Sequence, residues 1–149
     1  MAAPNTSPRF TKAANISSAL VTAANTSSQG GGTIATDIFK AFTADATNGS
    51  FVEKVRWIPT ATAATTTSAT VARVFLSSVA SGATTSANTH LVAEVTLPAI
   101  AADNASTAVN PFDVPLGFTI PAGWTILVTN HAAPAANTAW KAITIGSDY

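Results

Sequence analysis

The apolar residues of this chain recur with a period of two in short runs, and this pattern most constrains the fold. The clearest run is His90–Leu97, in which Leu91, Ala93, Val95 and Leu97 alternate with polar residues. Such alternation places one face of a strand against a core and the other toward solvent. No stretch of the sequence keeps a 3.6-residue period over the length of a helix. The sequence therefore predicts an all-β protein.

Two short motifs predict where the chain turns between strands. Asn48-Gly49 is a strong signal for a two-residue hairpin. In the segment 116–129, Pro121 and Gly123 suit the second and fourth positions of a type I turn. We expect strands on both sides of each turn.

Proline positions and the number of strands narrow the architecture further. Pro111 and Pro115 restrict the segment 109–116 to a sheet edge or an irregular segment, because proline has no N–H to donate. Turn residues separate about seven or eight strand-like runs, a number typical of two packed antiparallel sheets. We expect an antiparallel β-sandwich of jelly-roll type.

The first 32 residues differ in composition from the rest. They are rich in Asn, Ser, Thr and Ala and end in the glycines 30–32. This composition predicts an extended N-terminal arm over residues 1–32, joined through a glycine hinge to a sandwich core over residues 33–149. We expect deletion of residues 1–32 to leave a folded core that no longer binds its partner.

The chain carries very little charge. Charged residues are 9% of the sequence and the formal net charge is zero. That balance gives no long-range attraction to nucleic acid or to an anionic membrane, and it protects a free monomer poorly against association. No apolar run approaches the roughly 20 residues of a membrane helix, and no signal-peptide core is visible. We expect synthesis in the cytoplasm and a surface that partners cover.

Residues capable of chemistry are sparse. The two histidines, His90 and His131, stand apart in the sequence, and the seven acidic residues are scattered. A metal site or a hydrolytic triad needs several such groups at a workable geometry. Glu53 shares its predicted strand face with Phe51 and Val55, which predicts a partly buried carboxylate paired with a lysine or arginine. We expect no enzyme, no cofactor and no metal.

Three tryptophans raise the alternative of a carbohydrate-binding module, since exposed tryptophans can stack on sugars. Trp57 and Trp124 share predicted strand faces with Phe, Ile and Val, which favours packing in the core over sugar binding. The carbohydrate hypothesis requires at least one of Trp57, Trp124 and Trp140 to be exposed beside Asp or Asn in a shallow groove. Tryptophan exposure therefore separates the two interpretations.

The chain combines Thr/Ala/Ser-rich loops, an N-terminal arm, and the segment Phe118-Thr-Ile-Pro-Ala-Gly-Trp-Thr-Ile-Leu-Val-Thr before a short last strand. In these features it resembles the small decoration (cement) proteins of tailed bacteriophages. The resemblance is one of general character over residues 33–149, and a recognisable sequence pattern covers only about residues 115–146. The resemblance implies a non-enzymatic, homotrimeric virion protein on the capsid exterior, whose partners are the major capsid protein and itself. A tail, baseplate or fibre component would satisfy the same sequence.

The resemblance also implies where a capsid would be bound, because several members of this class reach neighbouring subunits with an N-terminal arm. Cationic side chains of the arm would meet acidic capsid loops, and its apolar side chains would anchor in grooves. The candidate contact residues are Arg9, Phe10, Lys12, Ile16, Leu20 and Val21.

Overall fold

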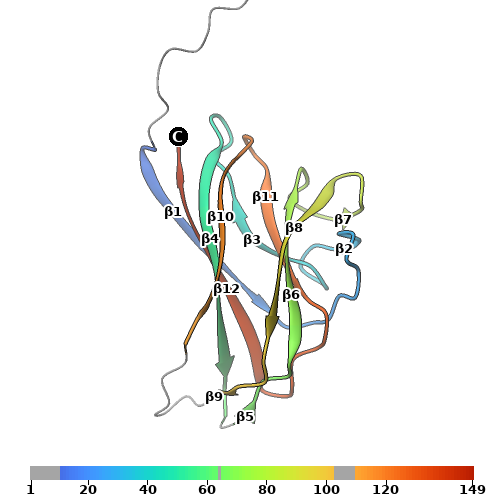
Figure 1. Cartoon of the computed structure of the whole chain (residues 1–149). Helices are drawn as coiled ribbons and strands as arrows, with labels where there is room; N and C mark the ends of the chain where they lie inside the picture. The colour runs from blue at the N-terminus through green and yellow to red at the C-terminus, as the bar shows by residue number, and fades with distance from the viewer. Residues whose placement is uncertain (1–10, 64, 103–109) are drawn as a thin grey trace, which may run out of the picture.

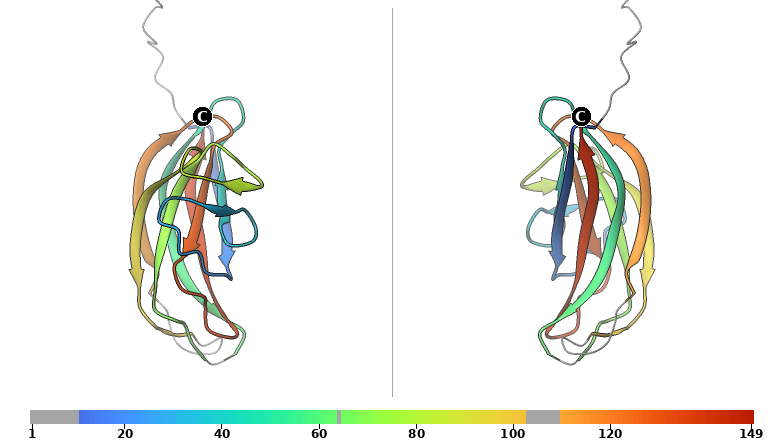
Figure 2. Two further views of the ribbon diagram at one scale, coloured as in Figure 1. Left: turned by 90° about the vertical axis from the view of Figure 1, so that its right-hand side faces the viewer. Right: turned by 90° about the vertical axis from the view of Figure 1, so that its left-hand side faces the viewer.

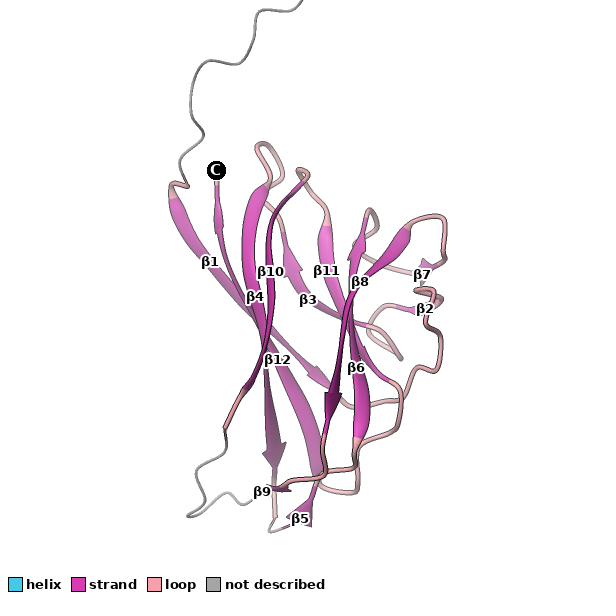
Figure 3. Ribbon diagram, viewed as in Figure 1, coloured by secondary structure: helices cyan, strands magenta, loops and turns pink. Residues whose placement is uncertain are grey.

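The computed structural model describes residues 11–63, 65–102 and 110–149, which form strands and loops without a helix (Figures 1 and 3). The long strands are β1 (Ala13–Val21), β3 (Phe39–Thr43), β4 (Ser50–Ala61), β6 (Thr70–Ser77), β8 (Thr89–Leu97), β10 (Phe112–Ile120), β11 (Thr125–Asn130) and β12 (Thr138–Asp148). Four short strands form two small ladders in the described residues: β2 (Gly32–Thr33) with β7 (Ala83–Thr84), and β5 (Thr65–Thr66) with β9 (Ala101–Ala102).

The long strands make two four-stranded antiparallel sheets that pack face to face. Sheet A has the order β1–β12–β4–β10 and sheet B the order β3–β11–β6–β8. The predicted all-β antiparallel sandwich is confirmed. The strand β10, which contains Pro115, lies at the edge of sheet A, as the missing N–H of proline predicts.

The pairing of the strands is nested along the chain. β6 pairs with β8, β4 with β10, β3 with β11, and β1 with β12, so that each pair encloses the one before it. The ladders β4–β12 and β6–β11 then join these pairs into the two sheets. Most consecutive long strands therefore belong to different sheets.

Because of this nesting, the hairpin predicted at Asn48-Gly49 is wrong: the turn joins β3 of sheet B to β4 of sheet A. The local turn chemistry is present. The Asp45 carboxylate accepts hydrogen bonds from the N–H groups of Thr47 and Asn48, which lower the pKa of Asp45, and Gly49 has a φ of 78°. A turn sets only the local direction of the backbone, whereas burial across the whole fold decides which sheet the next strand joins.

The second predicted hairpin is corrected in the same way, since the turn after Ile120 connects β10 of sheet A to β11 of sheet B. The Trp124 N–H donates to the Pro121 carbonyl, which closes a four-residue turn. Gly123 is the third residue of this turn and has a φ of 73°. A positive φ at the third position is the requirement of a type II turn, so the predicted type I turn is wrong as well.

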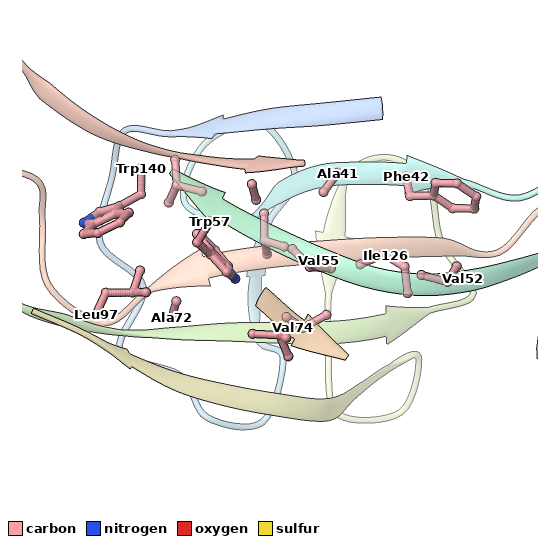
Figure 4. Packing of buried hydrophobic residues seen from close by; sticks show 14 of the residues in the cluster. Ala41, Phe42, Val52, Val55, Trp57, Ala72, Val74, Leu97, Ile126 and Trp140 are labelled. Carbon is pink, nitrogen blue, oxygen red and sulfur yellow. The ribbon is translucent and has the colours of Figure 1, made fainter. Parts of the chain in front are cut away.

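The main core lies between the sheets (Figure 4). Its largest side chains, all at most 1% exposed, come from both sheets: Trp57, Trp140, Phe42, Leu97, Ile120 and Ile126. Burying side chains of this size contributes about 1.5–3 kcal/mol each. This single core holds the two sheets together.

The outer face of sheet B carries a second, smaller core. Phe75 and Leu127 point away from the main core and are covered by Ile38 and the half-buried Ile34. Residues 22–38, which we call the strap, run across this face (Figure 2, left). The buried Arg73 holds the strap, because its guanidinium donates to the carbonyl of Asn25.

The prediction of an extended arm and a glycine hinge over residues 1–32 is wrong from Ala13 onward. Ala13–Val21 is strand β1, paired with β12 along all nine residues, and Val21 is fully buried. The strand was not recognised in the sequence because most of its inward-facing residues are polar or small. One of them, Ser17, donates its hydroxyl to the Ala41 carbonyl of β3. Gly30 is buried, and a Cβ there would lie 2.7 Å from the Thr89 side chain, so it serves close packing and not a hinge.

A β-bulge in β4 moves Glu53 off its predicted face. The ladder with β12 passes from Lys54 directly to Val52, which leaves Glu53 as the extra residue. Its side chain is 59% exposed, and Val52, instead of Phe51, is buried on the same side as Val55. The expectation of a partly buried Glu53 is therefore wrong.

A second bulge lies in β8. Its ladder with β6 pairs Val74 with Ala93 and Phe75 with Leu91, so Val92 is the extra residue. Leu91 is thereby placed opposite an outward-pointing residue and is 39% exposed. The predicted inward face is kept by the remaining residues, Ala93, Val95 and Leu97, which pack on the main core.

Candidate functional site: an uncovered apolar sheet face

No described segment crosses the outer face of sheet A (Figure 2, right), and this face carries an apolar surface. Five side chains from β1, β12 and β4 form this surface, which we call the isoleucine face: Ile16, Leu20, Ile58, Ile143 and Ile145. Ile16 is 63% exposed and Leu20 47%, and the other three are half-buried. The outer face of sheet B is covered by the strap, so the two sheets differ in this respect.

The strand register brings these residues together from distant parts of the chain. Ile16 of β1 lies opposite Ile145 of β12, and Leu20 lies opposite Lys141. Lys141 in turn lies opposite Ile58 of β4. Side chains of paired residues point to the same side of a sheet, so all five apolar side chains lie on one face of three strands, with Lys141 between Leu20 and Ile58.

A cluster of charges borders the isoleucine face on β4 and β10. Arg56 binds Asp113 with two hydrogen bonds, of 2.7 and 2.8 Å, and the Lys54 ammonium lies 3.2 Å from the same carboxylate. The Arg56 hydrogen bonds, and after them the Lys54 contact, lower the pKa of Asp113 to about 2. With the exposed Lys141, this side of the molecule carries more positive than negative charge.

We expect Arg56→Gln to raise the pKa of Asp113 from about 2 toward the ordinary value of 3.8, because the bidentate pair is lost. The folded-state pKa of Asp113 lies below its unfolded value. The pair therefore stabilises the fold above pH 4 and loses this effect as the pH falls from about 4 to about 2. Carboxyl-carbon NMR titration measures the shift, and Lys54→Gln should give a smaller one. An unchanged midpoint in Arg56→Gln would contradict the assignment.

The structure separates the six predicted contact residues. Ile16 and Leu20 lie on the isoleucine face, and Lys12 is exposed just before β1. Val21 is fully buried in the main core and cannot touch a partner, so that prediction is wrong. Arg9 and Phe10 lie outside the described residues.

Sequence reasoning did not identify the rest of this surface. The residues it missed come from β4, β10 and β12: Lys54, Arg56, Ile58, Asp113, Lys141, Ile143 and Ile145. In the sequence, Lys54, Arg56 and Ile58 alternate with the apolar residues Val55 and Trp57, and this alternation does predict that the three share an outward face. Only the strand register, however, places that row beside β12 and β1.

Shallow grooves lie at both ends of the face. One, of about 240 Å³, is lined by Leu20, Ala61 and Ala139 together with the threonines 22, 60, 62 and 138 and Asn137. The other, of about 340 Å³, lies beside Lys12, Phe51 and Glu53. The first groove is lined mainly by alkyl groups and hydroxyls, and the second also by charged side chains, which suits contact with another macromolecule.

The tryptophans do not form a sugar-stacking platform. Trp57 and Trp140 are buried in the main core, and Trp124 is half-buried. Their burial among the apolar side chains of the main core marks both rings as packing residues. The exposed tryptophan that a carbohydrate-binding module requires is therefore not among the three.

Elsewhere in the described residues, titratable side chains meet at Arg73, which binds Glu94 at 2.6 Å. His90 is exposed on β8, and the His131 ring lies 3.5 Å from the Arg73 guanidinium. Among the described residues, no three His, Asp or Glu side chains gather as metal ligands would. The same residues include no helix with the length and apolarity needed to cross a bilayer.

The fold and this face define an antiparallel β-sandwich in which the described residues cover the outer face of sheet B and leave that of sheet A uncovered. None of the family models, curated proteins or solved structures compared with the chain matches it significantly.

Proposed function

We propose that this chain is a non-enzymatic virion protein that decorates and stabilises the capsid of a tailed bacteriophage, with the isoleucine face as its contact with the major capsid protein. The observation that carries the proposal is the exposure of Ile16 and Leu20 on a sheet face that no described segment covers. Contiguous exposed apolar surface of this kind marks sites of protein interaction.

The size of the face supports a protein partner. The whole outer face of sheet A, taken as four strands of about nine residues at about 4.8 Å between strands and 3.3 Å per residue, spans roughly 600 Å². Stable protein interfaces bury about 800 Å² on each partner. The outer face of sheet A, of which the isoleucine face is the apolar part, is close to that size, whereas a small ligand would cover only a fraction of it.

The charges on the face indicate the chemistry of the capsid surface. Three cations, Lys54, Arg56 and Lys141, stand against two carboxylates on this side of the sheet, those of Asp113 and Glu53. Residual positive charge favours an apolar partner surface bordered by acidic side chains. Acidic capsid loops, expected from the sequence to meet an arm, would instead meet the sheet.

The strand topology supports a sandwich of the jelly-roll type, which is part of this proposal. Eight long strands with nested pairing in two sheets match the double Greek-key winding found in viral capsid domains. Decoration proteins of this type are homotrimers on the capsid exterior, and we propose the same arrangement here. Many copies that bind only the assembled shell would stabilise it by mass action, even when each contact is modest.

We expect the double variant Ile16→Lys, Leu20→Lys to lose saturable cosedimentation with capsids stripped of this protein. Each lysine places a charge within apolar contact surface, and truncating interface hot spots costs about 2 kcal/mol or more, which is roughly 30-fold in affinity. Both side chains are exposed, so the melting temperature of the free variant should stay close to that of the wild type.

The matched control is the double variant Thr36→Lys, Ser86→Lys, which adds the same two charges at exposed positions away from sheet A. Capsid binding by the double variant at wild-type affinity would rule out the isoleucine face as the contact. Wild-type protein that binds isolated tails and not capsids would place the chain in the tail or fibre alternative.

A further inference from the structure

We propose that strand β8, an edge of sheet B whose outer side pairs with no described strand, is a self-association surface whose occupant is a second copy of this chain. The inference concerns a different surface from the isoleucine face and does not rest on the capsid contact. It identifies which part of the molecule would join copies to each other.

The edges of the two sheets are not equally protected. Along β1 and β3, Ser17 and Asn15 donate side-chain hydrogen bonds to the carbonyls of Ala41 and Thr43, so these two edges close on each other. In β10, Pro115 has no N–H, and the ladder with β4 is irregular immediately after it. Strand β8 runs for nine residues with neither proline nor lysine. Proteins that remain monomeric usually guard such an edge.

The bulge in β8 adds an apolar patch to this edge. Plain alternation would turn only every second residue outward, but Leu91 and its neighbour Val92 are 39% and 37% exposed. Together with Ile16 and Leu20 of β1, they are the exposed large hydrophobic residues of the described chain. Leu91 and Val92 lie in sheet B, whereas the isoleucine face belongs to sheet A, so both surfaces can be occupied at the same time.

The charges along β8 favour a neutral partner. Glu94 is bound at 2.6 Å by Arg73 of its own chain, which leaves no unpaired carboxylate to attract a cationic segment. A neutral, strand-forming chain with exposed apolar residues would fit this edge by adding its backbone to the sheet. A second copy has these properties: its net charge is zero, so two copies approach without long-range repulsion.

Sedimentation equilibrium over a range of concentrations tests this proposal on the full chain without capsids. We expect the wild type to associate, and the variant Leu91→Lys, Val92→Lys to require at least a tenfold higher concentration for the same degree of association. Amide exchange along β8 should slow as the wild-type concentration rises. The double variant Ser86→Lys, Ala87→Lys, in the exposed loop before β8, adds the same two charges; it is the matched control and should associate normally.

The variant Ile16→Lys, Leu20→Lys should also associate normally, which separates this proposal from capsid binding. Wild-type protein that stays monomeric at all concentrations would overturn the inference. An unchanged association in Leu91→Lys, Val92→Lys, with native circular dichroism, would overturn it as well.

Discussion

Replacing Trp57 with alanine is expected to lower the free energy of unfolding by about 3–5 kcal/mol, the range seen for large aromatic residues in cores. The Trp57 ring is completely buried at the centre of the contact between the sheets (Figure 4). The neighbouring strands are held by ladders on both sides of β4, so they cannot collapse to fill the space. A loss of this size is a large part of the 5–15 kcal/mol that stabilises a typical domain.

Urea unfolding monitored by circular dichroism measures this change. Trp57→Phe should cost less, about 1–2 kcal/mol, because it leaves a ring in place and removes an indole N–H that has no hydrogen-bond partner. Trp124→Ala, at a half-buried tryptophan, is the matched control and should also cost less than Trp57→Ala. A loss below about 1 kcal/mol for Trp57→Ala would contradict the central role of this ring.

Deleting residues 1–32 is expected to unfold the protein, in contrast to the sequence-based expectation of an autonomous core over 33–149. The deletion removes the whole of β1 and its ladder with β12, together with the buried Val21. It also removes Asn25, the residue through which Arg73 holds the strap over Phe75 and Leu127. The combined loss should exceed the roughly 5–15 kcal/mol of net stability available to a domain.

Far-UV circular dichroism and thermal melting of the truncated chain test this expectation. A truncation of residues 1–10 alone keeps every contact described above, and it should melt as the full chain does. A chain lacking residues 1–32 that melts cooperatively near the wild-type temperature would show that β1 and the start of the strap are dispensable. The sequence-based arm would then be the better description.

Much of the fold class was readable from local patterns. The alternation in 93–97 predicts the inward face of β8, and Pro115 predicts a sheet edge. The glycines at 49 and 123 mark turns correctly. The hairpins inferred from those turns are wrong, because the nested pairing sends the strands on either side into different sheets.

The candidate site was readable only in part. Ile16 and Leu20 were predicted as contact residues, and the structure leaves both exposed, but it places them on a strand and not on an arm. Val21 was grouped with them because it is adjacent in sequence, yet in β1 it turns inward and is buried. Adjacent strand residues point to opposite faces, so an unrecognised strand leads to this error.

By itself, the sequence determined the local properties of this protein: strands in place of helices, the positions of turns, an edge at β10, and a surface with no net charge. These follow from the sterics and solvation of residues close together in the chain. The tertiary structure alone decided that β1 completes sheet A, that the strap covers sheet B, and that Ile16 meets Ile145. Such pairings are selected by burial between residues far apart in sequence, and one bulge residue such as Glu53 reverses the faces that alternation predicts.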